Sequence, residues 1–172
     1  MTRGRIASAL AMGALVAGFV TGAATAASAA TGSAHFIKHA TTASMSGSNL
    51  VVSFKEAGLA SGAVETVTSS ATATTTYECV NGGGHNPSAS NKTTTQSGVS
   101  TSGTFTADKN GNITGSETLS PPTASQLGFS CPPGQTVTFV SVSYSNVMVS
   151  DETSGASISL PGTYSYTNPS AP

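Results

Sequence analysis

The sequence of 172 residues contains no Trp, few aromatic residues and little charge. Charged residues make up 8% of the chain, whereas about a quarter is usual in soluble domains. Six Lys and Arg residues are too few to form the dense basic face that displaces counterions from phosphates. Nucleic acid is therefore excluded as a partner. The same scarcity of charge excludes a disordered tail that is held extended by charge repulsion.

Residues 1–29 have the three parts of a secretory signal peptide in the usual order. Arg3 and Arg5 form a basic start, residues 6–20 form an apolar stretch, and a run of small residues ends at Ala29. The apolar stretch is shorter than the ~20 residues that a membrane-spanning helix needs. We therefore expect cleavage after Ala29, or after Ala26 as the alternative site, and secretion of the remainder. No later segment is long and apolar enough to span a membrane.

Cleavage after Ala29 would remove both Arg residues, so that Lys38, Lys55, Lys92 and Lys109 are the only basic residues left apart from His. Arg supplies the usual bidentate clamp for carboxylates and phosphates. Phosphate-bearing ligands are therefore not expected.

Cys79 and Cys131 are the only cysteines. An even pair in an exported chain predicts a disulfide. A metal-binding pair would need further ligands close by, and a catalytic thiol would need a His partner. Neither the spacing nor the context of the two cysteines supports a metal site or a catalytic thiol. Since no Cys follows the apolar stretch, a lipid anchor at the cleavage site is not expected.

The rest of the chain has the composition of short β-strands, because it is rich in Ser, Thr and Val and poor in helix-favouring residues. Residues 50–54 and 64–77 are predicted as strands. The apolar positions that would share one strand face are Leu50, Val52 and Phe54 in the first, and Val67, Ala71, Ala73 and Tyr77 in the second. The alternation in residues 136–150 changes phase twice, which predicts β-bulges or a strand that changes sheet.

Turn residues divide the remaining segments. Asp108-Lys109-Asn110-Gly111 predicts a hairpin between strands at 104–107 and 112–119, and Pro161-Gly162 predicts another between 156–160 and 162–166. Residues 35–45 are interpreted as a further strand, 97–103 as a loop and 168–172 as a loose tail. Seven to nine short strands without a helix predict a single antiparallel β-sandwich over residues 30–167, with one disulfide. An immunoglobulin-like arrangement is one form of it, although no Trp is present to pack on the disulfide as in antibody domains.

The most distinctive segment follows the predicted strand end at Cys79. The candidate binding loop consists of Asn81, Gly82, Gly83, Gly84, His85 and Asn86. Three glycines free the backbone, and the Asn side chains can cap their own turns. A loop held by a disulfide on a rigid sandwich suits ligand binding. The alternative is an ordered turn whose polar groups satisfy its own backbone.

Residues 79–87, Cys-Val-Asn-Gly-Gly-Gly-His-Asn-Pro, are followed by Asn91-Lys92 and preceded by Ser-Phe-Lys-Glu-Ala-Gly-Leu at 53–59. In these motifs the chain resembles small secreted proteins of unknown function from actinomycete bacteria. The Ala-rich signal peptide that starts with Arg is similar in style. The resemblance implies export and a bacterial origin, and it carries over no catalytic residue.

No catalytic or metal-binding pattern is recognisable. His35 and His39 would share a strand face, but no carboxylate or thiol lies near them in the sequence. Residues 108–119 lack the Gly and Glu that an EF-hand has at its sixth and twelfth positions. Asp151 and Glu152 are adjacent on a predicted turn, and so do not form the separated carboxylate pair of a glycosidase. We expect neither a metal nor a cofactor.

The sequence therefore predicts a secreted, non-enzymatic binding, adhesive or envelope-associated structural module. Its extracellular ligand is not specified by any motif. Cell wall or polysaccharide is one candidate, although without Trp the four Tyr residues would have to provide the stacking surface. A small secreted hydrolase and a proteinaceous enzyme inhibitor are the alternatives.

Overall fold

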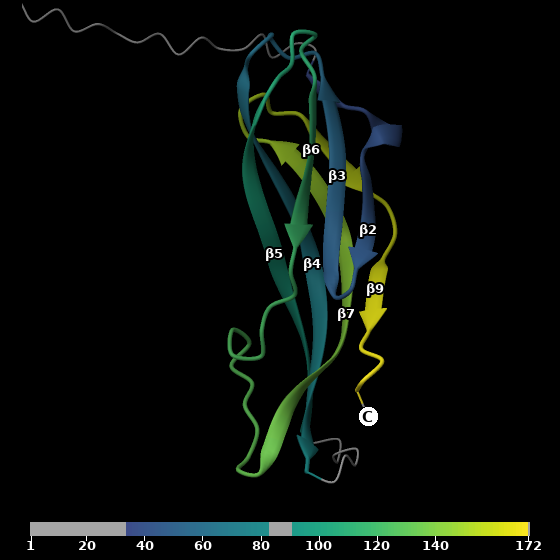
Figure 1. Cartoon of the computed structure of the whole chain (residues 1–172), viewed down its shortest axis with the longest axis vertical. Coiled ribbons are helices and arrows are strands. Elements are labelled where there is room, and N and C mark those ends of the chain that lie inside the picture. The colour runs from purple at the N-terminus through teal and green to yellow at the C-terminus, as the bar shows by residue number, and fades with distance from the viewer. Residues whose placement is uncertain (1–33, 83–90, 172) are drawn as a thin grey trace, which may run out of the picture.

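The computed structural model describes residues 34–82 and 91–171, and its strands form two antiparallel sheets that pack together (Figure 1). The first sheet contains β1 (His35–Phe36), β2 (Thr42–Ser46), β3 (Asn49–Ala57) and β6 (Ile113–Leu119). The second contains β4 (Val64–Asn81), β5 (Lys92–Thr106), β7 (Gln135–Asp151), β8 (Ser157–Leu160) and β9 (Tyr164–Thr167). The predicted all-β sandwich is confirmed.

The two sheets differ in length. β3 is the central strand of the first sheet, with β1 and β2 on one side and β6 on the other. The second sheet has the order β5-β4-β7, and β4 and β7 are 18 and 17 residues long. These long strands extend well beyond the first sheet at the lower end of the molecule (Figure 1). Residues 120–134, between β6 and β7, run beside this lower half.

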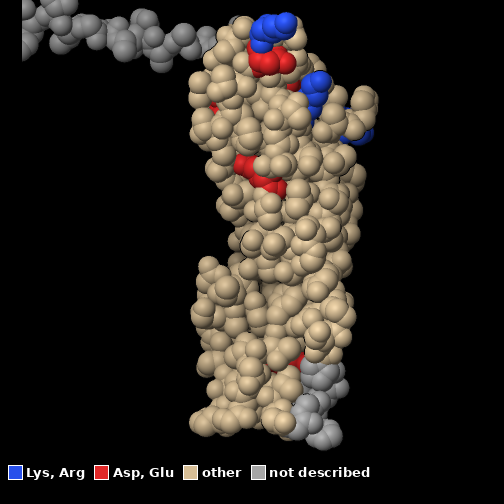
Figure 2. All heavy atoms as spheres, in the orientation of Figure 1, with Lys and Arg blue, Asp and Glu red and all other residues tan. Residues whose placement is uncertain are grey.

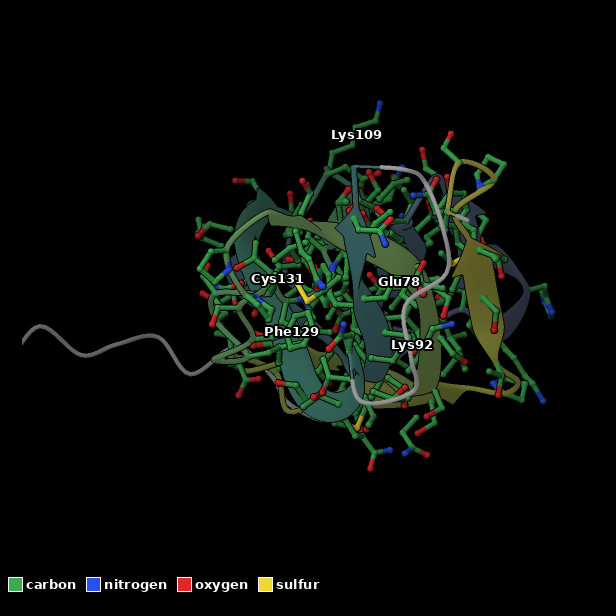
Figure 3. All side chains as sticks on the ribbon, turned by 90° about the horizontal axis from the view of Figure 1, so that it is seen from below. Glu78, Lys92, Lys109, Phe129 and Cys131 are labelled. Atoms are coloured by element: carbon green, nitrogen blue, oxygen red, sulfur yellow. A yellow bond between two sulfur atoms is a disulfide. The ribbon has the colours of Figure 1, made fainter. Side chains whose placement is uncertain are left out.

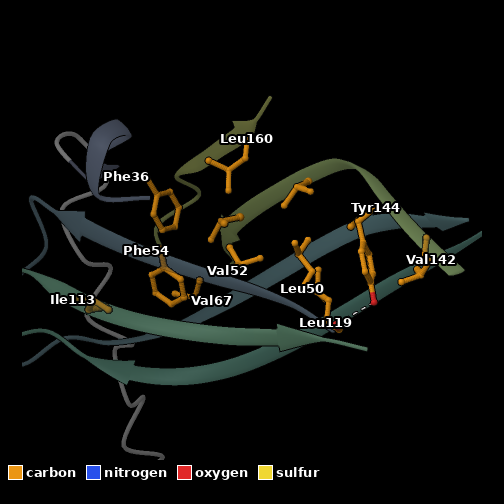
Figure 4. Packing of buried hydrophobic residues seen from close by; sticks show 14 of the residues in the cluster. Phe36, Leu50, Val52, Phe54, Val67, Ile113, Leu119, Val142, Tyr144 and Leu160 are labelled. Atoms are coloured by element: carbon orange, nitrogen blue, oxygen red, sulfur yellow. Dashed lines mark hydrogen bonds between the residues drawn. The ribbon is translucent and has the colours of Figure 1, made fainter. Parts of the chain in front are cut away.

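The core lies between the sheets where both are present (Figure 4). The predicted inward faces of β3 and β4 are confirmed, because Leu50, Val52 and Phe54 are buried against Val67 and Ala73. Alternating positions of both sheets thus supply one continuous hydrophobic cluster.

Tyr144 of β7 is the largest fully buried side chain among the described residues. Its hydroxyl donates to the carbonyl oxygens of Ser48, at 2.9 Å, and Leu119, at 3.3 Å. A buried Tyr needs such a partner for its polar end. Burial raises the pKa of Tyr144 to about 12, so the hydroxyl remains a donor at any physiological pH.

The predicted β-bulges are present in β7. Its register against β4 shifts between Ser70 and Thr72 and again between Thr76 and Tyr77. Each shift inserts an extra residue on β7, which returns the following side chains to the inner face. A strand that alternates irregularly in the sequence therefore keeps one apolar face, formed by Phe139, Val142, Tyr144, Val147 and Val149.

Neither predicted hairpin forms. β5 pairs with β4, whereas β6 pairs with β3, so the turn at Asp108–Gly111 carries the chain from one sheet to the other. The turn itself is present, since the Gly111 amide donates to the Asp108 carbonyl at 3.0 Å. β8 and β9 pair one after the other along β7, because this long strand offers enough edge for both.

Two further expectations are corrected. Residues 97–103, expected as a loop, lie in the middle of β5. They contain little apolar alternation, but the Thr-rich β4 provides a long partner, and hydroxyl pairs such as Thr68–Ser102 at 2.8 Å link the two strands. The strand expected at 35–45 is interrupted by a 3-10 turn, η1 (Lys38–Ala40), which separates β1 from β2.

The predicted disulfide is confirmed between Cys79 of β4 and Cys131 of the 120–134 segment. It does not join the two sheets, as the disulfide of an antibody domain does. Instead it holds the long connection between β6 and β7 against the lower half of the second sheet. Figure 3 shows it beside Phe129, viewed from that end of the molecule.

Candidate functional site

A groove of about 500 Å³ lies beside β5, near the level where β6 ends. One wall consists of residues 97–101 of β5. The other consists of Thr118, residues 120–122, Gln126 and Leu127. Figure 2 shows the outline of the molecule hollowed at mid-height on the side where β5 and the 120–134 segment run.

The wall formed by β5 is the edge of the strand. Side chains alternate between the two faces of a strand, so a pocket against one face is lined by every second residue. Here five consecutive residues line the groove, which places the backbone of β5 along it. β5 is also the outer strand of its sheet, and within the described ranges only β4 pairs with it.

Hydrogen bonds near the start of β4 show which backbone groups of β5 face outward. The Thr66 amide donates to Thr153, and its carbonyl accepts from the Glu152 amide, both on the β7 side. In an antiparallel ladder the N–H and C=O of one residue point the same way, and those of the next point the opposite way. Even-numbered residues of β4 therefore bond toward β7 and odd-numbered residues toward β5. The Ala107 amide, just beyond β5, accordingly donates to Ala63.

β4 and β5 pair in unbroken register from Val64–Thr106 to Glu78–Lys92. The odd-numbered residues of β5, such as Val99, consequently bond to β4. The N–H and C=O groups of Gly98 and Ser100 point away from the sheet and toward the groove, where the Gly98 carbonyl also accepts from the Ser97 hydroxyl at 3.4 Å. The outward-facing backbone donors and acceptors of β5 thus line the groove, spaced as a further β-strand would need them for pairing.

The groove lining is uncharged and contains no aromatic ring. On the face that Figure 2 shows, Lys and acidic side chains gather mainly in the upper part of the molecule, above the groove. A ligand in this groove would therefore meet neutral hydrogen-bonding groups. Sugar-binding surfaces commonly present aromatic rings for stacking, and this lining has none.

A row of aromatic rings fixes the far wall of the groove. Phe129 packs on Tyr77 with ring centroids 6.4 Å apart, and Tyr77 packs on Phe139 at 5.6 Å. The Tyr77 hydroxyl donates to the Pro122 carbonyl at 2.9 Å. Together with the disulfide, these contacts hold the 120–134 segment against β4. The position of this wall is therefore determined by β4 and not by the loop alone.

The Tyr residues do not form a common stacking surface. Tyr77 and Tyr144 are buried, and the Tyr164 hydroxyl donates to the Pro161 carbonyl at 3.1 Å. Tyr166 stacks on the ring of Phe139, with centroids 6.3 Å apart and planes inclined by 19°. This pair is half-buried.

Most of the candidate binding loop lies outside the described residues. Asn81 ends β4, Gly82 belongs to the following turn, and Gly83, Gly84, His85 and Asn86 are not described. Residues 1–29 also lie outside, so the predicted signal peptide stays a prediction.

Neither a metal-ligand cluster nor a membrane-spanning helix occurs in the part of the chain that the structure describes. No group of three or more His, Cys, Asp or Glu side chains is arranged there to hold a metal ion. Within the same ranges, no helix has the length and apolarity to cross a membrane. Comparison of the chain with protein-family models, curated proteins and solved structures finds no match.

Sequence reasoning missed a set of buried acids. Five of the seven acidic residues are buried, namely Glu56, Glu65, Glu78, Glu117 and Asp151. Four of them occupy the inward register of an apolar alternation: Glu56 follows Phe54, Glu65 precedes Val67, Glu117 precedes Leu119, and Asp151 follows Val149, each two residues away. This alternation was the signal that could have identified them.

The buried acids have few partners. Glu78 forms an ion pair with Lys92 at 3.0 Å, across β4 and β5 and away from the disulfide (Figure 3). Glu117 faces β4 and β5 near Ser69 and Gly103. Burial raises the pKa of its carboxyl, although the polar groups of these two residues act to lower it. Glu56, Glu65 and Asp151 lie near one another between the sheets.

Proposed function

We propose that the protein is a secreted, non-enzymatic binding module that takes an extended, uncharged peptide segment into the groove beside β5. The observation that carries this proposal is the open backbone edge of β5, at Gly98 and Ser100, along an uncharged groove. Export is supported by the signal-peptide pattern of residues 1–29, and the disulfide is compatible with an oxidising compartment.

An extended peptide matches the groups that the groove offers. An added strand bonds to the free edge of a sheet through its main chain, while shallow pockets select its side chains. Five residues of β5 provide a wall of about 17 Å at the usual rise per strand residue. Because no charge lines the groove, a charged peptide would lose solvation there without gaining a partner.

Replacing Ser100 by Pro is expected to weaken peptide binding at least about tenfold, because it removes one backbone donor that faces the groove. The probe is a peptide of eight alternating Thr and Val residues, acetylated and amidated at its ends, and binding is measured by calorimetry. The urea midpoint of Ser100→Pro should remain close to that of the unchanged protein, since an outward N–H is not used in the ladder with β4.

Val99→Pro is the matched control, because the Val99 amide bonds to β4 and its loss should destabilise the fold. A second control is the same peptide methylated on every backbone nitrogen, which keeps its side chains and removes the N–H donors of both edges. Equal binding of both peptides, or undiminished binding by Ser100→Pro, would contradict the proposal.

A polysaccharide ligand is a distinct outcome of the same experiments. The half-buried Tyr166–Phe139 pair is the surface that would bind it. The unchanged protein would then be retained on a cell-wall polysaccharide matrix. Loss of this retention in Tyr166→Ala, but not in Ser100→Pro, would indicate that the ligand is a polysaccharide and not a peptide. Hydrolysis of the peptide, or stoichiometric inhibition of a protease, would instead favour the enzyme or the inhibitor hypothesis.

A further inference from the structure

Three carboxyl groups from different strands meet between the two sheets. Glu56 of β3, Glu65 of β4 and Asp151 of β7 are exposed by only 0%, 1% and 1%. Asp151 lies within hydrogen-bonding reach of both glutamates. Ser154, in the turn between β7 and β8, donates its hydroxyl to Glu56 at 3.0 Å.

The donors in this region do not satisfy all the carboxyl oxygens. One oxygen of Asp151 accepts from the amides of Thr153 and Ser154, at 2.8 and 3.1 Å. Within the described residues, the second oxygen of Asp151 and the second oxygen of Glu56 have no hydrogen-bond donor. Glu65 has no close donor either, and the Thr153 hydroxyl is the polar group that acts on its carboxyl. A buried acceptor without a donor is costly, and a buried charge without a partner more so.

No cation is among the described groups that act on Glu56 and Glu65. On the first-sheet strands β1, β3 and β6 and just after β7, the other titratable groups are His35, Lys55, Glu117 and Glu152. His35 and Glu152 are exposed, and Glu152 accepts from the Ser150 hydroxyl at 2.9 Å. β5, β8 and β9 contribute no charged group near the cluster, since Lys92 lies at the far end of β5 in its ion pair with Glu78. The interactions that act on Glu56 come from Ser154, Asp151 and Glu65.

A shared proton resolves this arrangement. Two carboxyl groups in contact repel when both are ionised, whereas one protonated group donates a hydrogen bond to the other. The described residues offer no arrangement of ligands for a metal ion that would replace the proton. We propose that Glu56, Glu65 and Asp151 form a proton-holding cluster, which makes the folded protein most stable in acidic surroundings and less stable as the pH rises to neutral.

The direction of the pH dependence follows from the shifts of the two glutamates. Burial, reinforced by Asp151 and Glu65 and opposed by the Ser154 hydroxyl, raises the pKa of Glu56 from 4.5 to about 7. Burial and Asp151, opposed by the Thr153 hydroxyl, likewise raise the pKa of Glu65. Below pH 4.5 these groups are protonated in both the folded and the unfolded chain. Between pH 4.5 and about 7 the unfolded chain ionises while folded Glu56 keeps its proton, so stability is lost as the pH rises through this window.

The experiment measures the thermal midpoint, Tm, of the protein and of Glu56→Gln across this pH range, in EDTA. We expect the Tm of the unchanged protein to fall by about 5 °C or more between pH 4.5 and pH 7. In Glu56→Gln the Tm should fall by less than half as much over the same pH range. The amide has no proton to release, and its oxygen still accepts a hydrogen bond from the Ser154 hydroxyl. Glu152→Gln, an exposed acid one residue from Asp151, is the matched control and should follow the unchanged protein.

Two further measurements keep the proposal falsifiable if Glu56→Gln does not fold. Infrared spectra of the unchanged protein near pH 6 should show a protonated carboxyl band that disappears on unfolding. Calcium chloride should leave the Tm at pH 7 unchanged. A Tm that rises with pH, an equal slope in Glu56→Gln or absence of the band would overturn the proposal. A Tm at pH 7 that calcium raises and EDTA lowers would also overturn it, since the cluster would then hold a cation.

Discussion

Replacing Cys79 and Cys131 together by Ser will lower the free energy of unfolding by about 4 kcal/mol. The disulfide closes a loop across 52 positions, so its removal restores much chain entropy to the unfolded state. Cys79 is buried, and Ser in its place would add a polar group to an apolar site. Urea denaturation of the unchanged protein and of the double variant measures the difference.

The double variant should also lose peptide binding, because the disulfide holds one wall of the groove. Pro121, Pro122 and Gln126 lie in the segment that Cys131 fastens to β4. The contacts of Tyr77 with Phe129 and Pro122 would still restrain its position, but without the covalent link. A reducing agent should shift the unfolding of the unchanged protein toward that of the variant and leave the variant unaffected. A loss of stability below about 1 kcal/mol would contradict this role of the disulfide.

Phe54→Ala will lower the free energy of unfolding by about 3–5 kcal/mol. Phe54 is 1% exposed and packs edge to face against Phe36, at 6.0 Å, and Phe105, at 5.1 Å. Phe105 comes from the opposite sheet, so the ring joins the two layers at their upper end. Gly115 leaves room for both rings, since a Cβ there would lie 2.5 Å from Phe105 and 2.7 Å from Phe54. Alanine would leave a cavity that this close packing cannot fill.

Val64→Ala is the comparison for Phe54→Ala, because Val64 is 60% exposed at the start of β4. The free energy of unfolding of Val64→Ala should differ from that of the unchanged protein by less than about 0.5 kcal/mol. Chemical denaturation at a single acidic pH keeps the carboxyl cluster in one protonation state for both variants. A similar effect of the two substitutions would show that the Phe54 ring does not join the sheets.

The strands that carry apolar alternation were predictable from the sequence. Leu50, Val52 and Phe54 mark the inner face of β3, and the phase changes of residues 136–150 indicate the bulges of β7. Residues 97–103 were not predictable, because Ser, Thr and Gly without alternation have the composition of a loop. Only the long partner β4, far from them in the sequence, makes them a strand.

Turn residues specify that the chain reverses, but not which strand it then pairs with. Asp108 and Gly111 do form a turn, yet the strands on either side belong to different sheets. The groove could not be foreseen for the same reason. It depends on the unpaired edge of β5 and on the placement of Pro121 and Pro122, both of which are tertiary properties.

The buried acids were partly predictable. Glu56 and Asp151 continue the inward register of their strands, but charged residues are usually assigned to the surface. What the alternation does not indicate is that three different strands bring Glu56, Glu65 and Asp151 together. Their meeting depends on the register of β4 against β7 and on the stacking of the two sheets.

Amide hydrogen exchange, resolved by residue with and without the alternating Thr–Val peptide, tests the central claim most directly. Without peptide, the amides of Gly98 and Ser100 should exchange rapidly, whereas that of Val99 should be protected by its bond to β4. With peptide, protection should appear at Gly98 and Ser100 and not at residues of the Tyr166–Phe139 pair. Protection of Gly98 and Ser100 before the peptide is added, or no change at either amide when it binds, would contradict a binding site along the edge of β5.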